Sequence, residues 1–358
     1  MRKIICLIED LSSGGAERQL VYLASVLKRI GYNVQVWTYY PNSFYLPMLQ
    51  DAEVEYRYIP EAESKIKRLF VLRNRLKKYN PDVVIAYLDT ACMIACIIKA
   101  MGVKYKLVVS ERNTTQFLSK RERLKFFCYR FADKIVPNSQ TQSVFIRDNY
   151  PNLKSKVTTI TNYVDTKRFS PQNYQKPHKS IKMMVAGRIM PQKNPQTLIR
   201  AVKMLRDEGI VIDVTWYGNS YDSSFMKDCI SLVQRLGVSS SFRFLPSESD
   251  IAHIYPQYDV FCLPSLYEGF SNVLCEAMSC GQPIICSNVS DNPHIVHENQ
   301  NAFLFNPNHV ESIACAIKRF VFLSTEERQR MAEYSRAFAL SQFSSEHFIS
   351  QYELIINE

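Results

Sequence analysis

Two glutamates stand eight positions apart, Glu268 and Glu276, and enclose Gly269, Phe270, Ser271, Asn272 and Val273. The first glutamate follows an apolar run that ends near Leu263, and the second falls about one turn into a helical stretch. A carboxylate at the second position can accept two hydrogen bonds from a vicinal diol such as a ribose. The amides of residues 269–273 precede this helix and are placed to hold phosphate or sugar oxygens. The alternative, that Glu276 only complements the positive end of the helix, leaves Glu268 and Gly269 unexplained.

A second segment combines two cations with a glycine. Arg188 and Lys193 stand five residues apart in a loop that follows Gly187, contains Pro191 and opens a helix. Two cations at a helix N-terminus can bracket a diphosphate, and each charge-assisted contact contributes roughly 1.5–3 kcal/mol. The alternative is a surface loop with two solvated charges.

Glycine is rare, with 10 in 358 residues, so the positions that it occupies are informative. Gly14 and Gly15 follow the first apolar run, and Gly187 follows a later one. Glycine at a strand-to-helix turn permits close backbone approach and leaves helix amides directed at an anion. A plain tight turn is the alternative for Gly14 and Gly15. Neither turn has the G-x-G-x-x-G spacing, which argues against a dinucleotide-dependent oxidoreductase.

Other chemistries are excluded by what the chain lacks. The six histidines are scattered and the ten cysteines include no C-x-x-C pair, so we predict no metal site and reduced, buried thiols. The opening apolar run, residues 4–8, is followed by two acidic residues, and the longest later run, residues 91–98, is far shorter than the ~20 residues that span a bilayer. We therefore expect a cytoplasmic chain without a signal peptide or a membrane span.

The elements that must position these residues alternate along the chain. Apolar runs predict strands at residues 3–8, 33–38, 82–87, 106–110, 133–137, 181–186, 213–217, 260–263 and 283–286. Helical periodicity separates them, as at residues 16–30, 195–208 and 225–236. Buried runs that alternate with amphipathic helices predict parallel sheets covered on both faces.

The alternation restarts after a polar stretch at residues 170–180, which predicts two doubly wound α/β domains. We assign residues 1–168 to the first domain, 169–340 to the second, and 341–358 to a C-terminal helix that returns to the first. Ligands of such sheets bind beyond the carboxyl ends of the strands, and two facing domains place the site in a central cleft.

The net charge of +10 belongs to the first half of the chain. Residues 1–165 carry 26 Lys and Arg against 15 Asp and Glu, whereas residues 166–358 carry 18 against 19. Basic and apolar residues interleave in two segments, 65–79 and 120–131. We predict that these segments face an anionic membrane surface through Lys65, Lys67, Arg68, Arg121, Arg123 and Lys125. Amphipathic helices that expose solvated cations are the alternative. Nucleic acid is not an expected partner, because no nucleic-acid-binding motif accompanies the charge.

Together these motifs resemble retaining glycosyltransferase family 4. The resemblance is carried by Gly-Gly-Ala-Glu-Arg at 14–18, by Gly187-Arg188 with Lys193, and by the E-x7-E segment from Glu268 to Glu276. It extends over nearly the whole chain, because residues 160–165 and 169–171 are also similar to the family.

The resemblance implies a GT-B fold, with two Rossmann-like domains facing a central cleft. It implies transfer of a sugar from a nucleotide-sugar donor, with retention of anomeric configuration and without a metal or other cofactor. Arg188 and Lys193 would bind the donor diphosphate and stabilise the leaving group, and Glu268 would face the donor sugar as the third catalytic residue. The implied donor-binding residues are Gly15, Gly187, Gly269, Phe270, Ser271, Asn272, Val273 and Glu276.

Two segments depart from the family pattern. Many members carry a histidine after a mid-domain strand, where this chain reads Val109-Ser110-Glu111-Arg112-Asn113, similar to enzymes of bacterial cell-surface polysaccharides. We assign Glu111 and Arg112 to the cleft as sugar or acceptor contacts. The turn after the second strand of the nucleotide domain reads Gly218-Asn219-Ser220 in place of G-x-G.

The sequence thus predicts a hexosyltransferase that moves a hexose or N-acetylhexosamine from a nucleotide sugar to a lipid-linked or saccharide acceptor in surface polysaccharide synthesis. The resemblance favours UDP over GDP. The basic first half is expected to hold the enzyme peripherally on the inner face of the cell membrane. A non-hydrolysing nucleotide-sugar 2-epimerase, and a non-catalytic basic protein that binds membrane or nucleic acid, are the alternatives. The first needs acid–base residues that we do not identify, and the second leaves the E-x7-E segment unexplained.

Overall fold

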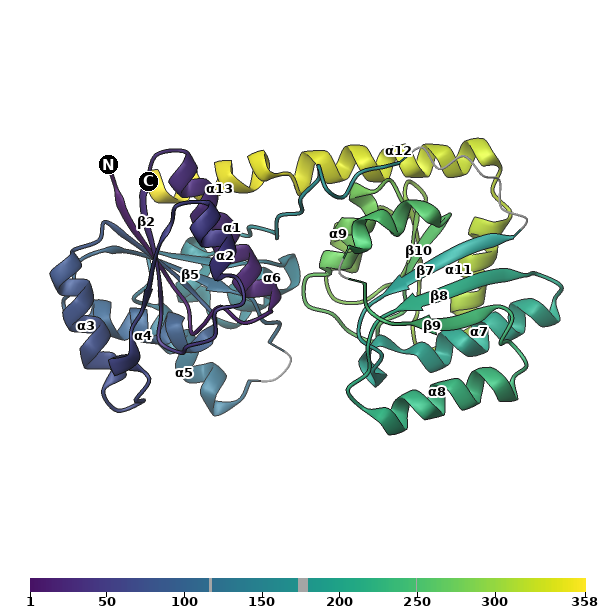
Figure 1. The fold of residues 1–358 in the computed structure, drawn as a ribbon, viewed down its shortest axis with the longest axis horizontal. Helices are drawn as coiled ribbons and strands as arrows, with labels where there is room; N and C mark the ends of the chain where they lie inside the picture. The colour runs from purple at the N-terminus through teal and green to yellow at the C-terminus, as the bar shows by residue number, and fades with distance from the viewer. Residues whose placement is uncertain (116–117, 173–179, 249) are drawn as a thin grey trace. The chain divides into compact units, whose positions relative to one another are not determined.

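The computed structural model describes residues 1–115, 118–172, 180–248 and 250–358. They form two compact units, Met1–Asn162 with Phe348–Glu358, and Tyr163–His347 (Figure 1). Each unit is a six-stranded parallel sheet covered by helices, as the alternation of strands and helices predicts. The second unit begins at Tyr163 rather than at residue 169, because Val164 already packs in its core.

The sheet of the first unit has the strand order β3-β2-β1-β4-β5-β6, and all its ladders are parallel. Its strands are β1 Lys3–Leu7, β2 Asn33–Thr38, β3 Glu55–Tyr58, β4 Val83–Tyr87, β5 Lys106–Glu111 and β6 Lys134–Pro137. The central strand β4 is buried along its whole length, so apolar side chains are required on both faces.

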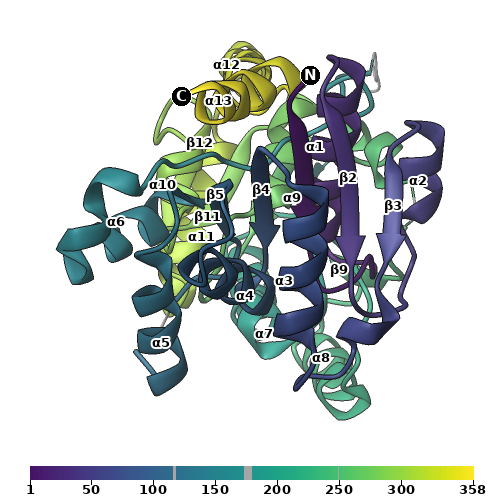
Figure 2. The same ribbon diagram turned by 90° about the vertical axis from the view of Figure 1, so that its left-hand side faces the viewer.

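Helices cover both faces of this first sheet. They are α1 Gly15–Arg29, α2 Leu46–Asp51, α3 Arg68–Tyr79, α4 Asp89–Ala100, α5 Lys120–Tyr129, α6 Gln140–Asn149 and α13 Ser345–Asn357, with short 3-10 turns at Pro60–Ala62 and Pro151–Lys156. Helices α3, α4 and α5 form one layer, with α4 between the other two, and α1 and α2 lie on the opposite face (Figures 1 and 2). Helix α13 packs beside α1, where the ring of Phe348 lies 6.1 Å from that of Tyr22.

The sheet of the second unit repeats this design in the order β12-β11-β10-β7-β8-β9. Its strands are β7 Ile181–Ala186, β8 Ile212–Tyr217, β9 Phe242–Leu245, β10 Val260–Leu263, β11 Ile284–Ser287 and β12 Ala302–Phe305. Strands β10 and β11 are buried throughout.

The helices of the second unit again form two layers. They are α7 Pro195–Asp207, α8 Ser223–Arg235, α9 Asn272–Ser279, α10 Asn292–Ile295, α11 Val310–Val321 and α12 Thr325–Gln342, with 3-10 turns at Pro191–Lys193, Ile251–His253 and Tyr255–Gln257. Helices α8, α7 and α11 pack side by side on one face, and α9 and α12 pack together on the other (Figure 1). A capping box of Ser324 and Glu327 fixes the start of α12.

The sequence predicts the inner strands of both sheets and the outer strand β6, but it misses the other outer strands. Each of the nine predicted runs lies on an observed strand with bounds that agree within one residue. The three missed strands, β3, β9 and β12, are all outer strands of their sheets. The residues of β3 alternate between exposed and half-buried, and β9 has one buried residue, Phe242, so both strands lack the continuous apolar run that marks a strand buried on both faces.

Candidate functional site

The predicted site residues of the second unit gather where its strand order reverses. The chain proceeds from β7 outward through β8 and β9, and then returns to place β10 on the other side of β7. The carboxyl ends of β7 and β10 are therefore neighbours, and the helices that follow them, α7 and α9, lie on opposite faces of the sheet (Figure 1). In open α/β sheets this is the position at which ligands bind.

Glycine is required in the turn that follows β7. Gly187 adopts φ +149°, and its carbonyl accepts a hydrogen bond of 2.8 Å from the indole of Trp216. A Cβ on Gly218, in the next turn along the sheet, would lie 1.9 Å from that same carbonyl oxygen. The two turns thus approach each other more closely than any side chain permits. The second glycine of the family's G-x-G turn is replaced here by Ser220, and the backbone of Gly218 preserves the close approach.

The loops after β7 and β10 are bonded to each other. The amide of Leu266 donates to the carbonyl of Gln192 at 2.8 Å, and the Gln192 side chain donates to the carbonyl of Tyr267 at 2.7 Å. Nζ of Lys193 lies 2.5 Å from Oε1 of Glu268. The structure therefore brings Lys193 and Glu268 together, although 75 positions separate them in the sequence. Arg188 lies exposed in the same β7 loop.

A third loop, after β11, supports the segment that begins at Glu268. The amide of Glu268 donates to the hydroxyl of Ser290 at 3.0 Å. The hydroxyl of Ser271 donates to Oδ1 of Asn292 at 2.9 Å, and Nδ2 of Asn292 donates to the carbonyl of Ser287 at 3.0 Å. Ser290 and Asn292 were not predicted from the sequence. Their only signal is a cluster of small polar residues after a buried strand.

Helix α9 carries the second glutamate. Glu276 is 6% exposed, and the hydroxyl of Tyr255 lies 3.4 Å from its Oε2. Phe270 is largely buried and Gly269 is half-buried, both directly before the helix. Among the predicted amide donors, that of Asn272 already donates to the carbonyl of Phe270 at 3.1 Å. The positive end of α9 thus lies in the segment that also holds Glu268.

A cavity of about 550 Å³ adjoins the β7 loop. Its walls include Ile189 of that loop, Asn219 after β8, and Phe244 and Pro246 at the end of β9. Asn219 Nδ2 donates to the Ser247 hydroxyl at 2.7 Å, and the Asn219 carbonyl accepts from the amide of Ile189 at 3.0 Å. This cavity was not predicted from the sequence, because β9 is an edge strand that the apolar pattern does not reveal.

In the first unit, Gly15 is the exposed first residue of α1, and Gly14 precedes it as the N-cap. A Cβ on Gly14 would lie 2.0 Å from the Glu17 carboxylate. Strands β1 and β4 are neighbours at the strand-order reversal of this sheet, and α1 is the helix that follows β1. Gly15 thus begins the helix after β1, whereas Gly187 directly follows β7, and each lies at the strand-order reversal of its own sheet.

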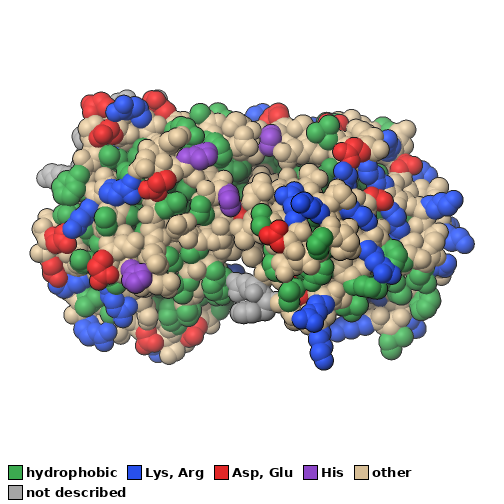
Figure 3. All heavy atoms as spheres, turned by 180° about the vertical axis from the view of Figure 1, so that it is seen from behind, with side chains coloured by type: hydrophobic (Ala, Val, Ile, Leu, Met, Phe, Trp, Pro, Cys, Tyr) green, Lys and Arg blue, Asp and Glu red, His purple; other side chains and the backbone are tan. Residues whose placement is uncertain are grey.

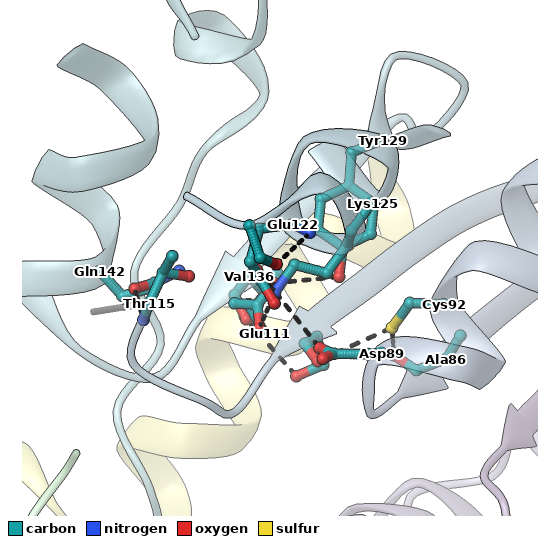
Figure 4. Close-up of polar contacts among 12 residues, drawn as sticks. Ala86, Asp89, Cys92, Glu111, Thr115, Glu122, Lys125, Tyr129, Val136 and Gln142 are labelled. Carbon is teal, nitrogen blue, oxygen red and sulfur yellow. Dashed lines mark hydrogen bonds and ion pairs between the residues drawn. The ribbon is translucent and has the colours of Figure 1, made fainter. Parts of the chain in front are cut away.

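Glu111, predicted as a sugar or acceptor contact, is buried with 1% exposure. Its carboxylate lies 3.1 Å from Nζ of Lys125 and accepts a hydrogen bond of 3.0 Å from the hydroxyl of Tyr129 (Figure 4). Burial raises the pKa of Glu111 to about 7, against the opposing effect of the Lys125 ammonium. The prediction of a ligand contact is wrong for Glu111, because its side chain is enclosed within the first unit.

Lys125 is likewise buried, with a side chain that is 1% exposed. Its ammonium also contacts Asp89 at 3.3 Å and Glu122 at 2.7 Å (Figure 4). Burial lowers the pKa of Lys125. These carboxylates and Glu111 outweigh that effect and hold the pKa above its usual value. Lys125 therefore cannot face a membrane, and that part of the surface prediction is wrong.

Arg68 is the second basic residue that the surface prediction misplaces. It is 4% exposed, its guanidinium donates to the carbonyl of Ala62 and the hydroxyl of Tyr40, both at 2.7 Å, and it stacks 4.2 Å from the ring centroid of Tyr39. Lys65, Lys67, Arg121 and Arg123 are exposed as predicted. Figure 3 shows the excess of Lys and Arg side chains on the visible face of the first unit, at the right of the view.

Arg112, the other predicted contact after β5, donates to Asn162, Tyr87 and Tyr352 within the first unit. Nine of the ten thiols are buried, and Cys315 is exposed. Across residues 1–115, 118–172, 180–248 and 250–358, no helix combines the length and the apolar character needed to cross a membrane.

Comparison with known proteins identifies the class. A crystal structure of a glycosyltransferase from Rickettsia africae ESF-5 matches with a TM-score of 0.87 at 18% identity, over 99% of this chain and 98% of that one. HepE from Anabaena, solved in complex with UDP, matches with a TM-score of 0.87 at 19% identity, over 99% of both chains. Two consecutive parallel α/β units of this kind form the GT-B architecture of glycosyltransferases.

Sequence comparison then identifies the family. The chain matches the family Glycosyltransferase Family 4 over residues 13–168 and Glycosyl transferases group 1 over residues 166–338. A relative from Campylobacter jejuni subsp. jejuni serotype O:2 is 27% identical over 290 residues, 78% of this chain and 77% of that protein. It is named GalNAc-alpha-(1->4)-GalNAc-alpha-(1->3)-diNAcBac-PP-undecaprenol alpha-1,4-N-acetyl-D-galactosaminyltransferase. The two family matches together span residues 13–338, so this chain belongs to glycosyltransferase family 4.

Proposed function

We propose that this glycosyltransferase moves a hexose or N-acetylhexosamine from a UDP-sugar to a lipid-linked or saccharide acceptor in surface polysaccharide synthesis. The proposal rests chiefly on the contact between Lys193 and Glu268 at the strand-order reversal, with Arg188 exposed in the same β7 loop. The solved relative with UDP supports the choice of nucleotide, and the name of the Campylobacter relative supports an undecaprenyl-diphosphate-linked acceptor.

The proposed role of the cations is to stabilise the leaving group. Glycosyl transfer releases a nucleoside diphosphate whose negative charge grows in the transition state, and preorganised donors lower that barrier. The Lys193 ammonium has three N–H donors, of which one is directed at Glu268, so two are available for phosphate oxygens. Arg188 and the N-terminal end of α9 complete the set.

The nucleoside is proposed to occupy the cavity after β8 and β9. Phe244 and Pro246 offer apolar walls to a planar base, and Asn219 offers polar groups at the rim. Glu276 would accept hydrogen bonds from the ribose diol, since a carboxylate oxygen pair can accept from two hydroxyls at once.

Retention and independence from a metal are part of this proposal. The family resemblance favours attack by the acceptor hydroxyl on the face from which the diphosphate departs. Arg188 and Lys193 supply positive charge where other transferases use a divalent cation. Glu268, paired with Lys193, would orient that ammonium and face the donor sugar.

We further propose that the first unit docks on the cytoplasmic, anionic face of the membrane. Lys65 and Lys67 precede α3, Arg121 and Arg123 lie on α5, and all four are exposed. Ile66 is 87% exposed and Phe70 is 59% exposed among these cations, an arrangement that suits a charged lipid interface.

Product analysis tests the proposal. Purified protein, treated with a chelator, is incubated with a panel of UDP- and GDP-sugars and an undecaprenyl-diphosphate-linked saccharide, and the product is analysed by mass spectrometry and NMR. We expect transfer from a UDP-sugar with the anomeric configuration retained. Inversion, a requirement for added metal, or an epimerised nucleotide sugar in place of a glycosylated acceptor would contradict it.

A further inference from the structure

Arg112 directly follows β5 and bonds to residues that are distant in the sequence. Its Nη1 donates to Oδ1 of Asn162 at 2.8 Å, and its Nη2 donates to the hydroxyls of Tyr87 at 2.7 Å and Tyr352 at 2.8 Å. The guanidinium carbon lies 4.4 Å from the ring centroid of Tyr87. The two tyrosine hydroxyls are 2.8 Å apart. We call these four residues, Arg112, Tyr87, Tyr352 and Asn162, the Arg112 network.

The network lies where the chain leaves and re-enters the first unit. The chain passes between the units at Asn162–Tyr163 and again at His347–Phe348. Asn162 is therefore the last residue before the first connection, and Tyr352 lies on α13 shortly after the second. Tyr87 and Tyr352 are fully buried, Asn162 is 5% exposed and Arg112 itself is half-buried, so the bonds to Arg112 are partly shielded from water.

On the side of the second unit, the same two connections are bonded to each other. The amide of Val164 donates to the carbonyl of Phe343 at 2.9 Å, and both side chains pack in the core of the second unit. Helix α12 ends at Gln342 and α13 begins at Ser345. Each connection is thus fixed at both ends, by Arg112 in the first unit and by the Val164–Phe343 bond in the second.

Compact units joined by short connections move relative to one another by default, and a few residues at element ends absorb the motion. Here one side chain fixes the first-unit end of both connections, which confines the flexing to the few residues between the two anchors. An arginine is needed for this role. Its planar guanidinium spreads its N–H donors widely enough to reach three acceptors, whereas the compact ammonium of a lysine does not.

We propose that Arg112 is a positioning residue that fixes the hinge between the two units and so sets how an acceptor in the first unit meets the donor in the second. The inference rests on the proposed function, in which the donor binds after β7 and β10 and the acceptor is held by the first unit.

Distance measurements between the units test the hinge itself. Cys315 is exposed on α11 while the other nine thiols are buried, so it accepts one spin label, and an introduced Asn74→Cys on α3 accepts the second. Pulsed electron-spin resonance then gives the distribution of distances between the two labels. It is measured for the doubly labelled protein without further change and for the same protein carrying Arg112→Lys or Tyr352→Phe. Tyr352→Phe removes one hydroxyl and keeps the ring, so it is the variant least expected to impair folding.

The matched control is Tyr32→Phe. The Tyr32 hydroxyl also contacts α13, through Asn357 at 3.2 Å, but it lies outside the Arg112 network. We expect a broader distance distribution in Arg112→Lys and Tyr352→Phe and an unchanged one in Tyr32→Phe. Distributions that stay unchanged in both network variants, or that broaden equally in the control, would overturn the proposal.

Kinetics separate positioning from a general loss of structure. For both network variants we expect kcat/KM for the acceptor to fall at least fivefold, while the Kd for UDP stays within twofold of the unaltered protein. A broadened distribution with unchanged acceptor kinetics overturns the positioning role. If no sugar is transferred by any form of the protein, the proposed function fails, and the distance distributions still decide whether Arg112 fixes the hinge.

Discussion

Lys125 is surrounded by three carboxylates, and this buried cluster explains why two residues were misplaced from the sequence. Its ammonium lies between 2.7 and 3.3 Å from Asp89, Glu111 and Glu122. Buried charges persist only when they are paired and hydrogen-bonded, and a lysine has the donors to satisfy several acids. A basic residue on an amphipathic segment is usually solvated, so the sequence alone favours the surface. The tertiary contacts with Glu111 and Asp89 place Lys125 inside.

The raised pKa of Glu111 predicts how stability depends on pH. Burial raises this pKa from 4.5 to about 7. Between these values the folded protein retains a proton that the unfolded chain releases, so the free energy of unfolding falls as pH rises through the window. The full loss is about 3 kcal/mol. Glu111→Gln mimics the protonated form and is expected to flatten this dependence. Urea unfolding at pH values from about 5 to about 8 measures this pH dependence of the free energy of unfolding.

Glu333→Gln is the control for this experiment, because Glu333 lies exposed on α12 and its replacement leaves the cluster intact. This control is expected to keep the slope of the unaltered protein. An identical slope in Glu111→Gln would contradict the assignment of the titration to Glu111.

The cations of the β7 loop are predicted to act in turnover. Arg188→Ala and Lys193→Ala should each lower kcat at least about tenfold, a loss of about 1.4 kcal/mol in transition-state stabilisation. Lys203→Ala is the matched control, since this lysine pairs with Asp207 on α7, away from the site. Steady-state assays decide the matter, and full activity in both site variants would refute their role in stabilising the leaving group.

At the scale of elements, the sequence predicted the inner strands of both sheets and missed β3, β9 and β12, of which β3 and β9 are mostly exposed or half-buried and β12 is largely buried. Strands β7 and β10, which carry the site, were predicted with their observed bounds because both faces of each are covered. Strand β9 was missed, and with it the cavity that Phe244 and Pro246 line. The E-x7-E segment and the Arg188–Lys193 loop were identified from residue types. Their contact through Lys193 and Glu268 depends on the strand order, which local patterns do not encode.

The packing of the β7 and β8 turns makes a prediction about one glycine. In Gly218→Ala the new Cβ would lie 1.9 Å from the carbonyl oxygen of Gly187, so the β7 turn must shift. We expect at least a tenfold weaker affinity for UDP, measured by calorimetry, together with a lower Tm.

Gly209→Ala provides the comparison for this substitution. Gly209 also adopts a positive φ, +79°, but a Cβ at this position would meet no atom within 4 Å, so only backbone strain is added. Its Tm should fall by a few degrees while UDP affinity is retained. Equal affinities in the two variants would show that the close approach of the turns does not shape the site.

At the scale of the whole molecule, the uneven charge distribution predicts where the protein binds lipid. Each exposed cation near an anionic surface contributes about 1 kcal/mol, so replacing Lys65, Lys67, Arg121 and Arg123 by Gln should weaken vesicle binding by up to about 4 kcal/mol. Co-sedimentation with vesicles of mixed anionic and neutral lipid measures the loss of binding. Added salt should weaken the binding of the unaltered protein in the same way, because it screens exposed charges.

The control for this prediction neutralises four exposed cations of the second unit, Arg200, Lys227, Arg235 and Arg330. It changes net charge equally and should leave vesicle binding intact. Binding that is indifferent to anionic lipid, or that falls equally in both variants, would exclude a specific face on the first unit.

A crystal structure of the protein with UDP is the most direct test of where the donor binds. We predict a pyrophosphate within about 3 Å of the side-chain nitrogens of Arg188 and Lys193. We also predict the ribose hydroxyls on Glu276 and the base in the cavity beside Asn219. A nucleotide bound elsewhere, or one that leaves both cations directed into solvent, would contradict the proposed donor site.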